Sequence, residues 1–180
     1  MKTIITMILM ISVSLSQGVV YMDLGLAPQA EVEVSAAGMS ISDSEDLETG
    51  SLSIGYYQPI YQISDNMGLF IGGSYEVMPA TDEDDFEFGF MALYSSVGYS
   101  LSDQLSAWGS LGLSIPTSSD LTDADAEMGM HMGMGVTYSA TDKIGVALGY
   151  VVNSTSVDMG DGLSADWDFS KIALSLGYRL

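Results

Sequence analysis

Apolar side chains alternate with small or polar ones along most of the chain. Over residues 171–180 every second side chain is apolar, and residues 128–140 and 144–152 show the same period of two. Such a period over 9–11 residues indicates a β-strand, and this length suits a strand that crosses a membrane at a tilt. We predict eight strands, near residues 30–41, 50–63, 67–78, 86–101, 105–115, 128–140, 144–152 and 167–180.

Two kinds of connection separate these strands. Residues 61–65, 99–103 and 138–142 each carry a Tyr, two residues, then Ser or Thr and Asp. Ser-Asp and Thr-Asp favour tight turns, because their short side-chain oxygens bond the backbone just ahead. Long polar stretches alternate with these turns, at 42–49, 79–85, 116–127 and 153–168. Strict alternation of short and long connections predicts an antiparallel, up-and-down arrangement.

The two faces of the predicted strands differ in a way that indicates a membrane rather than water outside. One face is apolar, while the other carries mostly Gly, Ser, Ala and Thr, which suit the narrow lumen of an eight-stranded barrel. A soluble periplasmic barrel would place charged residues on its outer face instead. Four tyrosines at the short-turn end predict an aromatic girdle at the membrane interface, namely Tyr61, Tyr99, Tyr138 and Tyr178.

The charge of the chain is strongly negative and unevenly placed. Asp and Glu number 24 against four Lys and Arg, giving a formal net charge of -20. Nucleic acid is therefore not an expected partner, because phosphate binding needs clustered Lys and Arg. The four long stretches hold 16 of the acids, four in each, and none of the basic residues. We expect them to form long acidic loops at one end of the barrel.

The N-terminus indicates secretion. Lys2 precedes an apolar run over residues 4–15, which is too short to span a membrane, and small residues follow. We interpret residues 1–16 as a signal peptide, residues 17–29 as a periplasmic N-terminal lead-in, and residues 30–180 as the barrel.

The turns, the long loops and the final Tyr178-Arg179-Leu180 resemble the small eight-stranded outer-membrane barrels of the OmpX and OmpA transmembrane-domain type, over about residues 30–180. The resemblance implies an all-β, eight-stranded antiparallel up-and-down transmembrane β-barrel, with short periplasmic turns and long outer loops, in the outer membrane of a Gram-negative bacterium. It also implies contact with membrane lipids and lipopolysaccharide, insertion through the C-terminal strand, and a monomer. The family usually ends in an aromatic residue, where this chain has Leu180.

Few residues suggest chemistry. Counting from the turns places Glu76, His131 and Lys171 at similar depth on the inward face, so we expect a polar cluster in the lumen in which Glu76 meets Lys171. His131 is the only histidine, and no nucleophile or acid lies beside it in sequence, so we expect no catalysis. We also expect no resident cofactor.

The loop acids raise the question of metal binding. The acids do not follow the spacing of a calcium loop, so two interpretations stay open: a plain solvated surface, or weak Ca²⁺ or Mg²⁺ contact through carboxylate oxygens. The candidate ligands are Asp82, Asp84, Asp123, Asp125 and Glu127.

The sequence favours a non-enzymatic outer-membrane barrel with an acidic crown of surface loops. Its expected role is structural or interactive: envelope stability, adhesion or divalent-cation contact. Two alternatives remain open, a lipid-modifying barrel enzyme and a pore for small solutes.

Overall fold

A computed structural model describes residues 18–36, 39–160 and 163–180. Its elements are almost all strands, and they follow the alternating segments of the sequence. Their bounds are β1 Val19–Ala36, β2 Met39–Asp46, β3 Leu52–Ser64, β4 Met67–Met78, β5 Ala80–Thr81, β6 Glu87–Phe88, β7 Phe90–Ser100, β8 Leu105–Pro116, α2 Ser119–Asp123, β9 Gly129–Ser139, β10 Ile144–Gly160 and β11 Leu163–Arg179.

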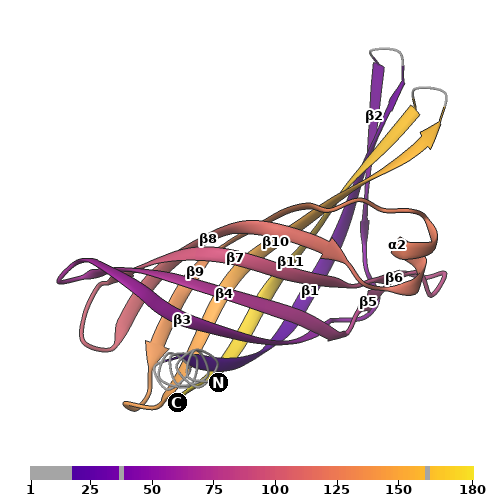
Figure 1. Cartoon of the computed structure of the whole chain (residues 1–180). Helices are drawn as coiled ribbons and strands as arrows, with labels where there is room; N and C mark the ends of the chain where they lie inside the picture. The colour runs from indigo at the N-terminus through magenta and orange to yellow at the C-terminus, as the bar shows by residue number, and fades with distance from the viewer. Residues whose placement is uncertain (1–17, 37–38, 161–162) are drawn as a thin grey trace, which may run out of the picture.

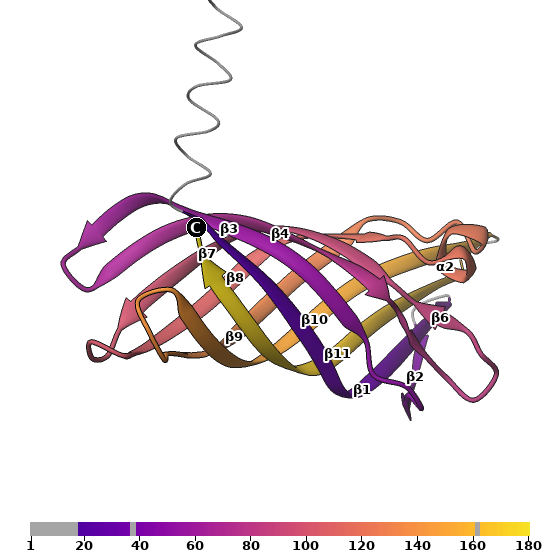
Figure 2. The ribbon, with the colours of Figure 1, turned by 90° about the horizontal axis from the view of Figure 1, so that it is seen from below.

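Eight of these strands close into a barrel. The order is β1-β3-β4-β7-β8-β9-β10-β11, every neighbouring pair is antiparallel, and β11 pairs with β1 to complete the ring (Figures 1 and 2). The predicted up-and-down eight-stranded fold is therefore confirmed. Three tight connections lie at one end, between β3 and β4, β7 and β8, and β9 and β10.

The first barrel strand begins earlier than the sequence indicated. Val19 to Leu24 pair with both β3 and β11, so most of the expected lead-in over residues 17–29 belongs to the barrel wall. The register against β11 shifts between Leu26 and Gln29, and Ala27 has a φ of 45°. This bulge interrupts the period of two, which explains why the segment resembled a turn. The expected signal peptide, residues 1–16, lies outside the described residues.

Two expected loops are largely extended strand. Beyond the barrel, residues 29–36 of β1 pair on one side with residues 39–46 of β2 and on the other with residues 163–170 of β11. These β11 residues pair in turn with residues 152–160 of β10. We call these four paired segments the projecting sheet. Figure 1 shows them rising from the long-loop end of the barrel. The stretches 42–49 and 153–168 thus serve as sheet more than as loop.

The long-loop end of the barrel holds an apolar core, which we call the outer cluster. The β4–β7 connection, which contains β5 and β6, and the β8–β9 connection, which contains α2, fold inward over the barrel. The Ser118 hydroxyl links the two connections, because it donates to the Glu87 carbonyl at 2.7 Å and accepts from the Gly89 N–H at 3.2 Å. Aromatic rings contact one another within the cluster, in stacked and tilted pairs, at centroid distances of 5.0–6.4 Å. The cluster comprises Ala30, Leu47, Ala80, Phe88, Phe90, Leu121 and Phe169, with Phe86, Ala126 and Trp167 packed against it.

The outer surface of the barrel wall is apolar. Its exposed residues include Met132, Met134, Leu148 and Leu174, whereas Gly133 points inward between them. Tyr61, Tyr99, Tyr138 and Tyr178 are exposed near the short-turn end, at the height where a girdle is expected. Among the described residues, no helix is long and apolar enough to cross a membrane.

Candidate functional site in the barrel lumen

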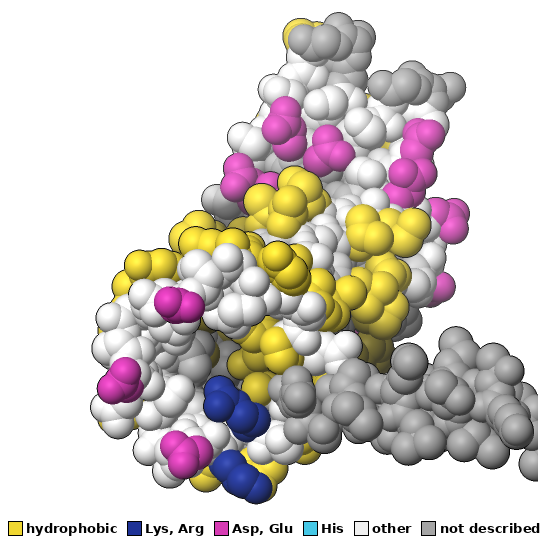
Figure 3. Space-filling view, turned by 60° about the vertical axis from the view of Figure 1, so that its left-hand side comes forward, with side chains coloured by type: hydrophobic (Ala, Val, Ile, Leu, Met, Phe, Trp, Pro, Cys, Tyr) yellow, Lys and Arg dark blue, Asp and Glu magenta, His cyan; other side chains and the backbone are white. Residues whose placement is uncertain are grey.

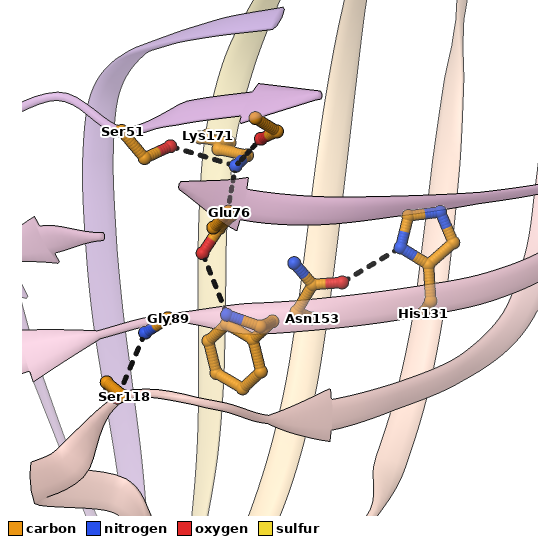
Figure 4. Close-up of polar contacts among 9 residues, drawn as sticks. Ser51, Glu76, Gly89, Ser118, His131, Asn153 and Lys171 are labelled. Atoms are coloured by element: carbon orange, nitrogen blue, oxygen red, sulfur yellow. Dashed lines mark hydrogen bonds and ion pairs between the residues drawn. The ribbon is translucent and has the colours of Figure 1, made fainter. Parts of the chain in front are cut away.

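The lumen contains a buried ion pair. The Lys171 ammonium from β11 contacts the Glu76 carboxylate from β4, across the barrel interior (Figure 4). Lys171 also donates to the Ser51 hydroxyl at 2.9 Å and to Ser53 at 3.4 Å, and Glu76 accepts from the Phe90 N–H at 3.0 Å. Buried charges persist only when paired and hydrogen-bonded in this way. The structure thus brings together two members of the expected polar cluster.

A third charged side chain of the lumen, Asp23, is less well hydrogen-bonded than Glu76 and Lys171. Asp23 on β1 stands directly opposite Ser53 on β3, which in turn stands opposite Glu76 on β4. One of its carboxylate oxygens, Oδ1, is buried and has no hydrogen-bond partner. Among the described residues, the lumen interior therefore holds two carboxylates and one ammonium.

His131 lies nearby on β9 and belongs to a separate hydrogen-bonded group. Its Nδ1 lies 2.8 Å from Asn153 Oδ1, and its Nε2 lies 3.3 Å from Ser110 Oγ. The ring stacks on Tyr94 with centroids 5.1 Å apart. His131 contacts neither Glu76 nor Lys171 directly, so the expected cluster is two neighbouring groups. Ser, His and Asn in this order resemble the arrangement of a nucleophile, a base and an orienting group.

Aromatic side chains fill part of the lumen because glycines face them. A Cβ atom at Gly135 or Gly149 would lie 2.7 Å from the Trp108 ring, so both positions need glycine for this packing. Tyr21 on β1 reaches across the barrel to Tyr94 on β7, and their hydroxyl oxygens are 2.6 Å apart.

A cavity of about 610 Å³ lies in the lumen. Residues of the short-turn end line it, among them Asn66, Lys143 and Arg179, and it continues past the tyrosines to Glu76 and Lys171. Phe90 marks its inner limit, because the other rings of the outer cluster do not line it. The described residues therefore form a cavity that opens toward the short turns and is closed at the long-loop end.

The acids at the opposite end are arranged on a surface rather than around a point. Asp82 accepts from the Asp84 and Phe86 N–H groups at 2.9 Å, and so caps its own turn. No group of three or more His, Cys, Asp or Glu side chains within the described ranges is placed to hold a metal ion. The candidate ligands named from the sequence therefore do not form such a group; they are Asp82, Asp84, Asp123, Asp125 and Glu127.

The outward face of the projecting sheet carries an unexpected array of carboxylates. Glu31 stands directly opposite Asp168 in the β1–β11 ladder, and Glu33 opposite Asp166. Burial and the neighbouring Asp166 carboxylate raise the pKa of Asp168 above its ordinary value. Figure 3 shows acidic side chains along the projecting segments and the exposed basic ones at the other end of the molecule. Serines flank the array on both sides, namely Ser42, Ser44, Ser154 and Ser156.

Sequence reasoning missed several of these residues. Asp23 fell in the expected lead-in, and Ser110 and Asn153 lie 21 and 22 residues from His131, so only the strand register brings them together. A signal was present for Asp23: it occupies an inward position between the outward Met22 and Leu24.

No protein family model matches the chain, and no curated protein matches it closely enough to count as a relative. Among solved structures, the chain is similar to Ail, the attachment invasion locus protein of Yersinia pestis, at 14% identity and a TM-score of 0.44, covering 91% of this chain and 99% of that one. It is similar to Neisserial surface protein A at 10% identity and a TM-score of 0.44, covering 89% and 97%. It is also similar to the outer membrane protease OmpT from Escherichia coli, at 10% identity and a TM-score of 0.47, covering 93% and 98%. Because these likenesses are distant, the eight-stranded barrel is established by the strand ladder of the chain itself.

Proposed function

We propose that this chain is a non-enzymatic outer-membrane barrel that holds an acidic, serine-rich sheet outside the bilayer for interaction. A change along one face of β11 carries the proposal. Tyr178, Leu176, Leu174 and Ile172 are exposed and apolar, and the next residues on the same face are Ser170, Asp168 and Asp166. Apolar side chains at such exposure suit lipid, and the acids just beyond suit water. The switch within two residues marks a bilayer boundary.

The acidic face supports an interaction role. Like charges directly opposite one another on a sheet destabilise it. A surface that keeps Glu31 against Asp168 and Glu33 against Asp166 attracts cations and basic partners. Divalent cations would be drawn there diffusely rather than to a formed site, and they would bridge the acids to anionic lipopolysaccharide. Closure of the β-sheet leaves the barrel strands no free edge, which suits a monomer inserted through its C-terminal strand.

Single cysteines test this placement, because the chain has no native cysteine. We expect a membrane-impermeant maleimide to label Ser164→Cys, in the projecting sheet, on intact cells. Ser102→Cys, in the β7–β8 turn, is the matched control and should react only after the outer membrane is opened. Labelling of the turn alone on intact cells, or release of the protein by a carbonate wash, would overturn the proposal.

A second candidate is an esterase in the lumen, favoured by the geometry of Ser110, His131 and Asn153. It differs from the lipid-modifying enzyme considered above, because the three side chains face the cavity rather than the lipid. Ser110 lies mid-strand, where the adjacent backbone N–H groups belong to the ladders with β7 and β9 and cannot stabilise an oxyanion. We therefore rank it second. If the parent protein hydrolyses p-nitrophenyl acetate and Ser110→Ala abolishes this activity, the esterase becomes the favoured function.

A continuous pore is the least favoured role. Phe88, Phe90 and Phe169 are nearly fully buried in the outer cluster and close the long-loop end. Eight strands leave an interior that side chains largely fill. Conductance in planar bilayers that rises when Phe88 is replaced by Ala would indicate that this cluster is what blocks passage.

A further inference from the structure

The lumen interior carries one negative charge that its own residues do not balance. Glu76 and Lys171 neutralise each other, and Ser51, Ser53 and the Phe90 N–H complete their hydrogen bonds. Asp23 is left over, with Oδ1 buried and without a partner. An unpartnered buried carboxylate oxygen is costly, and the cost falls when a cation lies beside it.

The charges at the cavity mouth do not supply this cation. Lys143 and Arg179 line the opening together with Asp142, and all three are exposed to solvent. Exposed charges of both signs at the mouth are largely screened by water and salt. The imbalance therefore belongs to the interior, around Asp23.

The walls of the cavity are of the kind that receives an organic cation. Tyr21, Tyr57, Phe70, Tyr94 and Trp108 all line it. Tyr57 contacts Tyr21 with ring centroids 5.9 Å apart and Phe70 at 5.8 Å, so these rings form a continuous surface. Aromatic faces attract alkylammonium groups, and the attraction strengthens where water is excluded.

A metal ion fits the lumen less well than an organic cation. Calcium and magnesium take six or more oxygen ligands, whereas the described lumen residues include no group of three acidic, His or Cys side chains placed around one point. An alkylammonium ion needs only one carboxylate and aromatic faces. A volume of about 610 Å³ lies within the range of small-molecule pockets.

We propose that the lumen is a binding site for a small organic cation of the alkylammonium class, which enters from the short-turn end, with Asp23 as its counter-ion and the tyrosines as its aromatic wall. The site is independent of the acidic sheet at the other end of the molecule, so it stands or falls separately from the function proposed above.

Choline is the probe for the test, and Trp108 is the reporter. The chain has two tryptophans, and Trp167 lies in the outer cluster, so Trp167→Phe leaves Trp108 as the only one. In the folded barrel in detergent, we expect choline to produce a saturable change in Trp108 fluorescence. The neutral isostere 3,3-dimethylbutan-1-ol should produce no saturable change at the same concentrations.

Asp23→Asn keeps the shape of the side chain and removes the charge, so it should weaken choline binding about tenfold or more, which corresponds to about 1.4 kcal/mol. Asp103→Asn, in the exposed β7–β8 turn, is the matched acidic control and should bind like the parent. Tyr57→Leu keeps the charge and removes one aromatic face, and it should also weaken binding. Heat-dependent gel mobility shows that each variant is folded.

Three results would overturn the proposal: no saturable change with choline, an equal response to the neutral alcohol, or the same affinity in Asp23→Asn as in the parent. If Asp23→Asn does not fold, unaltered binding by folded Tyr57→Leu overturns it instead.

Discussion

The outward face of the barrel wall and the outward face of the projecting sheet are built from the same strands yet have opposite chemistry. On β11, Leu174 and Ile172 are exposed and apolar, whereas Asp168 and Asp166 follow on the same face beyond Ser170. On β10, Leu148 and Tyr150 give way to Ser154 and Ser156 in the same manner. The β10–β11 ladder continues without a shift through this change, although β1 bulges at the same height, so the chemistry of the outward face changes while these two strands remain paired. Under the placement proposed above, these strands leave the bilayer without ending.

The largest effect is expected at the height where the two regions meet. Lys171 points into the lumen between the outward-facing Ser170 and Ile172. Lys171→Met would leave the Glu76 carboxylate buried without its counter-charge, which should cost about 3–5 kcal/mol of unfolding free energy. Unfolding by guanidinium in detergent measures it. Lys171→Met combined with Glu76→Gln should recover much of the loss, and strictly additive effects would contradict the pairing.

The next effect concerns the wall. Leu174→Arg places a charge in the apolar band and should lower the unfolding free energy by about 2–4 kcal/mol, because Arg at the bilayer midplane is poorly solvated. Leu174→Met is the control that keeps the surface apolar. Unfolding by guanidinium in lipid vesicles measures the difference between the two variants. An unchanged unfolding free energy in Leu174→Arg would mean that this face is not in lipid.

The same substitution on the projecting sheet should act in the opposite direction. Asp166→Arg would stand opposite Glu33 and replace a like-charge pair by an opposite one. The expected gain is about 0.2–1 kcal/mol, as for cross-strand charge pairs. Hydrogen exchange of the β1–β11 amides measures it, with Asp103→Arg in the β7–β8 turn as a control for net charge. A loss of protection would show that the array of acids is not under repulsion.

The smallest effect is a pH dependence confined to the projecting sheet. Because burial and Asp166 raise the pKa of Asp168, the folded sheet disfavours the ionised form of this carboxyl. The local stability of the sheet should therefore rise as the pH falls from the raised pKa of Asp168 toward the ordinary pKa of an Asp side chain. This gain in stability should be lost as the pH increases again. Amide protection factors of residues 163–168 report it, and Asp168→Asn should flatten their response. A uniform response along the whole of β11 would assign the effect to other groups.

Much of the wall could be predicted from the sequence because strand geometry is periodic. Tight turns at 61–65, 99–103 and 138–142 fixed the ends of six strands, and the antiparallel ladder then determines which residues share a level. Counting from the turns was enough to suggest that Glu76 meets Lys171, and the structure pairs them.

The parts of the structure that the sequence did not predict depend on features that interrupt or lack the strand period of two. The bulge at Ala27 concealed the first strand, and with it Asp23. The projecting sheet is rich in Ser and Asp, which favour turns in isolation, and only its neighbours in the ladder hold it extended. The inward folding of the long loops depends on Phe88 and Leu121 meeting Phe169 from distant parts of the chain, which no local pattern indicates.

The seam between β1 and β11 has a consequence for how the molecule is made. It runs from Val19–Arg179 to Ala36–Leu163, so it joins the first and last described strands of the chain along their whole length. Contacts between residues so far apart in sequence form slowly, because a long loop must close before they contribute any free energy. Until the C-terminal strand arrives, β1 and the strand that precedes β11 present unpaired edges, which are prone to aggregation in water. Assembly of this barrel is therefore governed by its final step, and the order of synthesis delivers the closing strand last.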